Sequence, residues 1–135
     1  MTETSPTPTD TILIVESDIL VRAPLAEYLR ECGYKVIESS SPGEARLVLQ
    51  AGGVRIDTLF ANVDAGAESG FSLAAWLRVN HPAIEVVLAG TVGRAVAQAG
   101  DLCEQGPALS RPYDHAQVLD RIRRLQAARN RAGTE

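Results

Sequence analysis

The chain has 135 residues, of which 45% are hydrophobic and 22% are charged, which is the composition of an ordinary globular domain. This length suits one domain with a core of its own, and the net charge of −4 gives no overall attraction to nucleic acid or to a membrane surface. No apolar run approaches membrane-spanning length, and residues 1–10 are too polar for a signal peptide. We therefore expect a cytoplasmic protein without a nucleic-acid or membrane partner.

Cys32 and Cys103 stand far apart in the sequence, without the close spacing of a metal-binding or redox motif. In a cytoplasmic protein, such residues are usually reduced and behave as small apolar side chains. We predict two reduced thiols in or near the core. We also expect no metal and no cofactor.

In chain order, residues 1–10 are typical of a disordered tail, and the apolar run 11–15 predicts a strand that ends at Glu16. The helix that follows has an apolar stripe predicted to be buried, made of Ile19, Leu20, Ala23, Leu25, Ala26, Tyr28 and Leu29. Pro24 would cost about 3 kcal/mol deep inside a helix, so we expect a late or bent start. Gly33 should end the helix in the left-handed conformation.

Residues 35–39 alternate enough to predict an edge strand. Ser41, Pro42 and Glu44 then give a strong helix-start signal: a capping serine, a proline in the first position and a glutamate that completes a capping box. This second helix should run to about Gln50, where Gly52 and the glycine after it release the chain.

Residues 58–61 are apolar without a helical period and end at Asn62, before an acidic, glycine-containing loop. A strand that is apolar on both faces is typical of the centre of a parallel sheet. Ligands of such sheets bind beyond the carboxyl ends of the strands. Asn62 is therefore where chemistry is expected, although it carries an amide and not an acid.

The second half of the chain continues the alternation of helices and strands. A helix opens at Ser69 and Gly70, and the sequence His81-Pro82 stops it; its inward residues are Leu73, Trp76 and Leu77. Residues 84–89 predict a buried strand, 90–106 contain a helix of low propensity, and 108–110 predict a short strand. Asp114 caps a final helix, whose buried face comprises Val118, Leu119, Ile122 and Leu125.

Five strands that alternate with five helices describe a doubly wound α/β domain, for which we expect the flavodoxin-like strand order 2-1-3-4-5. We place a single domain at 11–128, between the disordered tail 1–10 and a frayed C-terminus at 129–135. The chain shows no internal repeat or linker.

Several stretches of the sequence match one protein family in their residues, their order and their spacing. They are residues 12–16, 25–29 and 32–34, the pairs Ile56-Asp57, Gly70-Phe71 and His81-Pro82, and residues 111–113. Together they resemble the CheY-like receiver domain of two-component response regulators. The resemblance implies a site with two acids after the first strand that hold a divalent metal and an aspartate after the third that accepts a phosphoryl group. It also implies a hydroxyl residue after the fourth strand and a lysine before a proline after the fifth.

This chain departs from that pattern at nearly every site position. Glu16 matches the first acid, but the second falls on Ser17 and the phosphoryl acceptor on Asn62. The hydroxyl residue falls on Ala89, and the lysine falls on Arg111. Ala108 stands where the resemblance implies an aromatic switch residue, and the bond before Pro112 is a cis candidate.

The chemistry of these replacements predicts a degenerate site. An amide is no nucleophile and cannot form an acyl phosphate, and magnesium prefers charged oxygen ligands. Here the charges of Glu16 and Arg111 cancel, while the register of Asp18 suggests helix capping. We expect Arg111 to replace the metal by pairing with Glu16 and hydrogen bonding to Asn62.

The resemblance thus predicts a stand-alone pseudo-receiver that is not an enzyme and acts in phosphorelay signalling by protein contact. Its partner would be a histidine kinase, a phosphotransfer protein or an effector, and a homodimer is possible. The alternatives are a receiver phosphorylated at a displaced acceptor such as Asp64, and an anion or small-ligand binder that uses Arg111. Ser17 and Thr91 are weaker candidates for phosphorylation. The last helix is expected to be a solvated basic helix, with Arg121, Arg123, Arg124, Arg129 and Arg131.

Overall fold

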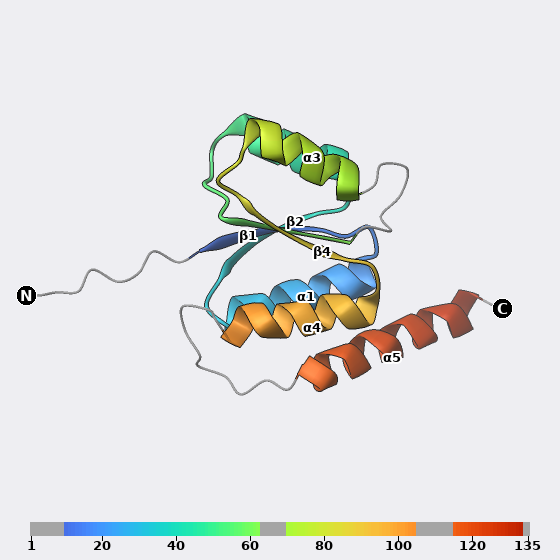
Figure 1. The fold of residues 1–135 in the computed structure, drawn as a ribbon. Helices are drawn as coiled ribbons and strands as arrows, with labels where there is room; N and C mark the ends of the chain where they lie inside the picture. Colours follow the sequence, from blue (N-terminus) through green and yellow to red (C-terminus); the bar gives the residue numbers. More distant parts are fainter. Residues whose placement is uncertain (1–9, 63–69, 105–114, 134–135) are drawn as a thin grey trace, which may run out of the picture.

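The computed structural model describes residues 10–62, 70–104 and 115–133. Within these ranges, four parallel strands form one sheet in the order β2-β1-β3-β4 (Figure 1). The strands are β1 (Thr11–Val15), β2 (Lys35–Ser39), β3 (Thr58–Asn62) and β4 (Glu85–Ala89). The helices are α1 (Ile19–Glu31), α2 (Pro42–Ala51), α3 (Gly70–Asn80), α4 (Val92–Glu104) and α5 (His115–Gly133). None of these helices is both long and apolar enough to cross a membrane.

The parallel α/β architecture and the neighbours of the first four strands are confirmed, and β2 lies at an edge as predicted. The predicted fifth strand at 108–110 falls outside the described residues, so the sheet has four strands where we expected five. The fourth strand was predicted to be buried, but most of its residues are not fully buried. Val86, Val87 and Leu88 are only partly buried, because no described strand lies beyond β4.

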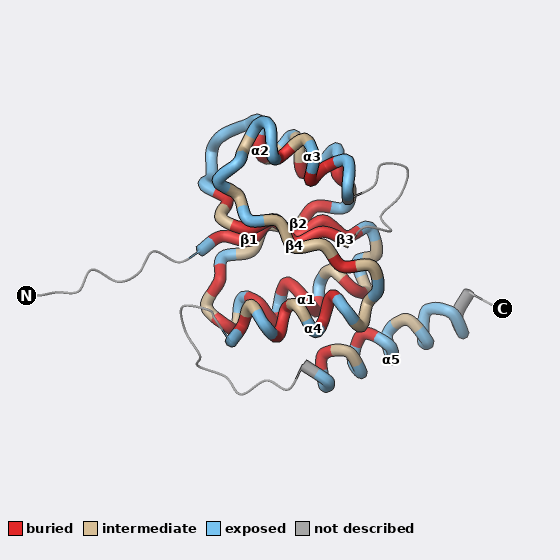
Figure 2. Tube along the Cα trace, viewed as in Figure 1, coloured by how far each residue is buried: buried red, intermediate tan, exposed pale blue. Residues whose placement is uncertain are grey.

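The sheet separates two helical layers, each of which buries one face of the strands (Figures 1 and 2). Successive side chains of a strand point to opposite faces, so Ile12 and Ile14 pack with α1 and α4, while Leu13 and Val15 pack with α2 and α3. Both layers therefore depend on β1, and all five residues of that strand are buried.

Helix α1 begins earlier than the sequence suggested. Asp18 is its N-cap and accepts a hydrogen bond from the Leu20 amide at 3.0 Å, so Pro24 is the sixth residue of the helix. The expected late start is wrong, because this cap satisfies the first turn and the buried ring of Pro24 packs inside the domain. Ile19 and Ala23 were also wrongly placed in the buried stripe, since Ile19 is 53% exposed and Ala23 is exposed as well.

The predicted C-terminal ends of α1 and α3 and both predicted ends of α2 are confirmed. The predicted cap of α5, Asp114, lies outside the described residues. The Ser41 hydroxyl accepts a hydrogen bond from the Glu44 amide at 3.1 Å, and the Glu44 carboxylate accepts one from the Ser40 amide at 2.6 Å. Gly33 and Gly52 have φ angles of 105° and 70°, which place both in the region that favours glycine. Helix α2 ends at Ala51, one residue after the predicted end.

The two cysteines are joined, and this corrects the prediction of reduced thiols. Cys32 caps the C-terminal end of α1, Cys103 lies in the last turn of α4, and the two form a disulfide with their Cα atoms 5.4 Å apart. Both are buried, as expected. The sequence could not show that two residues 71 positions apart meet, because their contact depends on the packing of α1 against α4.

Helix α5 runs in the opposite direction to α1 and α4 (Figure 1). Val118 and Arg121, early in α5, lie beside the second half of α1, whereas Arg129, near its end, contacts Asp18 at the start of α1. In a regular doubly wound fold, every helix runs antiparallel to the strands, so all helices are parallel to one another. Val118 and Ile122 are buried as predicted and Leu119 is partly buried. Leu125 is 37% exposed, because it lines a hollow beside Ile19 and Ala23 of α1.

Candidate functional site

The polar site lies at the carboxyl edge of the sheet, where β1, β3 and β4 end. Asn62 is the last residue of β3 and pairs in register with Ala89, the last residue of β4. Glu16 follows β1, and its amide donates to the Ser39 carbonyl oxygen at 3.0 Å, which continues the pairing with β2 by one residue. The structure therefore brings Glu16 and Asn62 together, as the parallel sheet predicted.

Glu16 is buried, and both of its carboxylate oxygens accept hydrogen bonds from the protein. The Asn62 side-chain amide donates to Oε1 at 2.7 Å, and the Asp18 backbone amide donates to Oε2 at 2.9 Å. These are charge-assisted bonds of the kind that stabilise a buried carboxylate. The amide of Asn62 thus serves as a donor, a role that an aspartate in its ordinary charged form could not fill.

Asp18 connects this edge to helix α5. Its carboxylate accepts hydrogen bonds from Gln126 Nε2 at 3.2 Å and from Arg129 Nη1 at 3.1 Å, in addition to capping α1. Burial acts to raise the pKa of Asp18, but the hydrogen bonds from the Leu20 amide, Gln126 and Arg129, together with the charge of Arg129, outweigh it. They hold the pKa of Asp18 below its ordinary value of 3.8.

Arg22 fixes the backbone beneath the site. Its Nη1 donates to the carbonyl oxygen of Glu16 at 2.8 Å, and its Nε pairs with Glu38 Oε1 at 3.2 Å. Arg30 contacts the other oxygen of Glu38 at 3.3 Å. These contacts connect the first turn of α1 to β2. The backbone of Glu16, which lies between β1 and α1, is therefore held by contacts with both α1 and β2.

The described residues do not suit the divalent metal that a receiver fold implies. In the ranges 10–62, 70–104 and 115–133, no three acidic, histidine or cysteine residues come together as a possible metal-binding group. Each carboxylate oxygen of Glu16 already accepts one hydrogen bond, Ser17 carries no charge and is exposed, and Asn62 carries a neutral amide that donates to Glu16. Magnesium requires several hard oxygens that are free to coordinate, so this arrangement does not fit it.

The remaining predicted site residues divide into two groups. Ala89 is buried at the end of β4, and Thr91 caps α4, where its hydroxyl accepts from the Arg94 amide at 3.1 Å. The others lie outside the described residues: Asp64, Ala108, Arg111 and Pro112. The pairing of Arg111 with Glu16 and the cis bond before Pro112 therefore stay predictions.

Sequence analysis missed three residues that shape this edge: Arg22, Gln126 and Arg129. Arg22 had a usable signal, because it stands four positions after the capping Asp18 and therefore one turn further along the same side of α1. Gln126 and Arg129 had none. Their contact with Asp18 depends on the direction of α5, which a local pattern does not encode.

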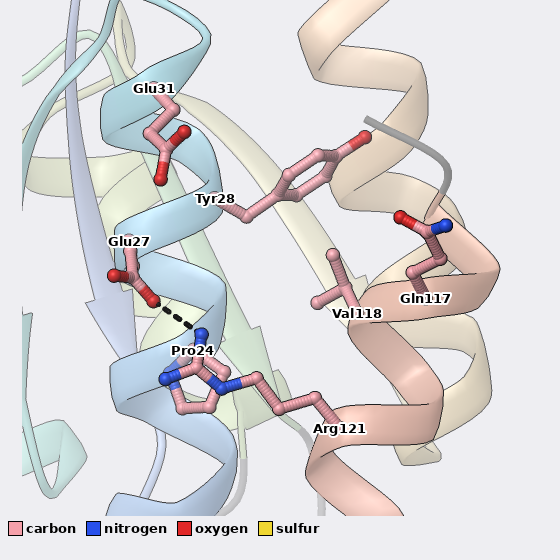
Figure 3. A pocket seen from close by; sticks show the side chains of 7 residues that line it. All are labelled: Pro24, Glu27, Tyr28, Glu31, Gln117, Val118 and Arg121. Atoms are coloured by element: carbon pink, nitrogen blue, oxygen red, sulfur yellow. Dashed lines mark hydrogen bonds and ion pairs between the residues drawn. The ribbon is translucent and has the colours of Figure 1, made fainter. Parts of the chain in front are cut away.

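A shallow hollow of about 150 Å³ lies between α1 and α5 (Figure 3). Pro24, Tyr28 and Val118 are its apolar lining, while Glu27 and Arg121 pair across it at 2.9 Å. Pockets that hold cofactors or drug-sized ligands are usually about 300 Å³ or more. A neighbouring hollow along α1 and α5, which reaches Ile19 and Leu125, has a volume of about 480 Å³. We take the carboxyl edge of the sheet as the candidate functional site because ligands of parallel α/β sheets bind beyond the carboxyl ends of the strands.

These features define a doubly wound α/β domain with a polar cluster at the carboxyl edge of a parallel sheet. The fold is that of the response-regulator receiver domains of two-component signalling, as the resemblance implied. Neither a protein-family model nor a curated protein matches the sequence.

Among solved structures, a response regulator receiver protein from Pseudomonas putida is 25% identical over 87% of this chain and 98% of its own, with a TM-score of 0.55. A response regulator from Thermotoga maritima is 22% identical over 86% of this chain and 96% of its own, also with a TM-score of 0.55. A Saccharomyces cerevisiae receiver domain, solved with a histidine phosphotransfer protein, is 18% identical over 69% of this chain and 74% of its own, with a TM-score of 0.54.

The double role of Asp18 gives a testable expectation. Asp18→Ala removes a helix cap and should lower the free energy of unfolding by about 1 kcal/mol, whereas Asp18→Asn keeps a good cap and should cost roughly half as much or less. Because the pKa of Asp18 is lowered by folding, its charge stabilises the protein above its ordinary pKa, and this is lost as pH falls through the lowered value. Denaturant unfolding at neutral pH and near pH 3 measures both effects. An Asn variant as unstable as the Ala variant would contradict the capping role.

Proposed function

We propose that this protein is a pseudo-receiver, a receiver-fold domain that has lost phosphoryl chemistry and acts in two-component signalling by protein–protein contact. The observation that supports this most directly is the closed hydrogen-bond arrangement of Glu16, Asn62 and the Asp18 amide. In it, the position that would accept a phosphoryl group holds an amide, and the remaining acid is already satisfied by protein donors.

The chemistry of phosphoryl transfer explains why this arrangement is inactive. Transfer requires a nucleophile and a positive charge that neutralises the phosphoryl oxygens, which receivers obtain from a carboxylate and a metal. Asn62 has no nucleophilic oxygen to transfer to, and the Glu16 oxygens are occupied. A role as a binding domain, and not as an enzyme, follows from this proposal.

The direct test is incubation of the protein with acetyl phosphate and magnesium, followed by intact-mass measurement. We expect no adduct. A phosphoryl adduct that maps to Asp64, Ser17 or Thr91 would overturn the proposal, and an adduct at Asp64 would establish the displaced-acceptor alternative. An increase in melting temperature with inorganic phosphate, abolished by Arg111→Gln and independent of magnesium, would instead support the anion-binding alternative.

Metal binding offers a second, independent expectation. We expect calorimetric titration with magnesium or manganese to show no saturable site at millimolar concentrations, because the described residues contain no group of three acidic, histidine or cysteine residues that could hold a metal ion. Glu16→Gln serves as the matched control, since it removes the acidic oxygens while keeping the size of the side chain. A saturable signal in the wild type that this variant abolishes would contradict the proposal.

The partner is expected to be a protein of a phosphorelay: a histidine kinase, a phosphotransfer protein or an effector. In one similar solved structure, a receiver domain is bound to a histidine phosphotransfer protein, which supports this class of partner. Any homodimer should form independently of phosphorylation. Sedimentation should therefore give the same mass with and without acetyl phosphate, and a change in mass would show that a phosphorylation switch persists.

A further inference from the structure

The Cys32–Cys103 disulfide lies at the end of the domain opposite to the Glu16 site. Helix α1 begins at the carboxyl edge of the sheet and ends at Glu31, just before β2 starts at Lys35. Lys35 pairs with Thr11, the first residue of β1, so this end of α1 belongs to the amino edge. The disulfide joins it to the last turn of α4. Breaking this bond would therefore affect the packing of α1 and α4 without involving the Glu16 site.

Helix α4 packs against α1, α5 and β4 through small side chains. Its buried residues are mostly small: Ala95, Val96, Ala99, Gly100 and Cys103. Burial of apolar area stabilises packing in proportion to that area, so these residues contribute less than the leucines and isoleucines that anchor other elements. The helix also contains Gly93 and Gly100, which lower its intrinsic stability.

At the C-terminal end of α4, two contacts connect it to the region of Cys32. One is the disulfide, and the other is a hydrogen bond from the Tyr34 hydroxyl to the Leu102 carbonyl oxygen at 2.6 Å. The covalent bond is therefore the strongest single constraint on this end of the helix.

We propose that Cys32 and Cys103 form a reversible redox clamp that controls the packing of α4 on α1. In the oxidised protein, α4 is held in the position that the structure shows. In the reduced protein, α4 loosens while the sheet and the α2–α3 layer stay folded. Because α5 packs on both α1 and α4, the surface that these three helices present would change with the redox state. This inference does not depend on the proposed pseudo-receiver function.

Thiol–disulfide exchange with a low-molecular-weight thiol such as glutathione balances the reaction. One glutathione thiolate attacks the Cys103 sulfur, which forms a mixed disulfide and releases Cys32 as a thiolate. A second glutathione thiolate attacks the glutathione sulfur of the mixed disulfide, which releases glutathione disulfide and the Cys103 thiolate. The protein gains two electrons and, as both thiolates take up solvent protons, two protons. Oxidation by glutathione disulfide is the reverse.

Access to the bond is limited, since Cys32 is 1% exposed and Cys103 is 6% exposed. Cys103 lies in the last turn of α4, and terminal turns open most readily in folded proteins. Its neighbours Asp101 and Glu104 are exposed, so opening one turn is enough to reach the Cys103 sulfur. Exchange should be slower than for an exposed disulfide but should not require unfolding of the domain.

The test has two measurements on the full chain. First, the protein is equilibrated with glutathione disulfide or with glutathione, and intact-mass and thiol-alkylation analysis reports the bond. Second, amide hydrogen exchange is followed in peptides from α4, with peptides from α2 and α3 as internal controls. We expect oxidation to remove two hydrogens from the chain. We expect reduction to speed exchange in α4 at least about tenfold more than in α2 and α3, where only the loss of global stability should contribute.

The double variant Cys32→Ala/Cys103→Ala is the matched control, because it should resemble the reduced protein and ignore the glutathione buffer. Failure of the bond to form under glutathione disulfide would overturn the proposal. Equal α4 exchange in both states would also overturn it, since the bond would then constrain nothing. Acceleration by the same factor in α2, α3 and α4 would show a disulfide that supports only the domain as a whole, which contradicts a local clamp.

Discussion

Replacing both cysteines, Cys32→Ala/Cys103→Ala, should lower the free energy of unfolding of the oxidised protein by roughly 4 kcal/mol. The bond closes a loop between residues 71 positions apart, which contains β2, α2, β3, α3, β4 and nearly all of α4. A cross-link over a loop of this size removes much of the conformational entropy of the unfolded chain, and in the chain-entropy model this accounts for the expected value. It is the largest effect that we expect from a change outside the central strands.

Denaturant unfolding with and without reductant measures this loss. The oxidised wild type should have the highest midpoint, and the reduced wild type should lie close to the variant, since both lack the cross-link. Any remaining difference between the reduced wild type and the variant reports the packing of the two sulfur atoms. Identical midpoints for the oxidised wild type and the variant would contradict this prediction. They would mean that the bond changes the free energies of the native and unfolded states equally.

The second large effect is expected from Asn62→Asp. This change replaces the amide that donates to Glu16 Oε1 at 2.7 Å with a second carboxylate, so a hydrogen bond becomes a close repulsion. We expect a loss of about 1–2 kcal/mol at neutral pH, because relaxation and proton uptake by the pair recover part of the electrostatic cost. Simple decay from an active receiver predicts the opposite, namely that restoring the acid is tolerated.

The pH dependence separates these explanations. A nearby like charge raises the folded-state pKa of the introduced carboxyl, so the loss is fully present above that raised pKa and disappears as pH falls below the unfolded value. Unfolding of wild type and variant at pH 7 and pH 4, each with and without magnesium, measures this. Magnesium should restore little stability, since Ser17 supplies no carboxylate. Asn62→Ala is the control, because it removes the donor without adding charge. Equal midpoints under all conditions would leave decay as the better explanation.

The direction of α5 distinguishes this domain from a regular doubly wound fold. Its C-terminal half reaches the carboxyl edge and contacts Asp18 through Gln126 and Arg129. The basic residues of this helix are exposed, as expected, but two of them also form ion pairs with α1 or its N-cap. Arg121 pairs with Glu27 at 2.9 Å, and Arg129 pairs with Asp18 at 3.1 Å. These contacts hold α5 against α1 and give its charges an intramolecular role.

Local patterns in the sequence were enough to determine most elements of this domain and one part of its site. Short apolar runs identified β1, β3 and β4, and alternation identified β2. Capping chemistry located the start of α2, and the parallel arrangement placed Glu16 beside Asn62. These features depend on residues that are close in the chain, or on a rule common to all parallel sheets: their carboxyl ends meet at one edge.

Only the tertiary structure decided the Cys32–Cys103 bond, the direction of α5 and the contact of Arg129 with Asp18. It also decided that α1 keeps Pro24 within the helix, where packing outweighs a local preference. Each of these depends on how α1, α4 and α5 pack together, and the apolar stripe of a helix does not distinguish a parallel from an antiparallel neighbour. Pairings between distant residues are therefore set by the assembled core and cannot be inferred from either segment alone.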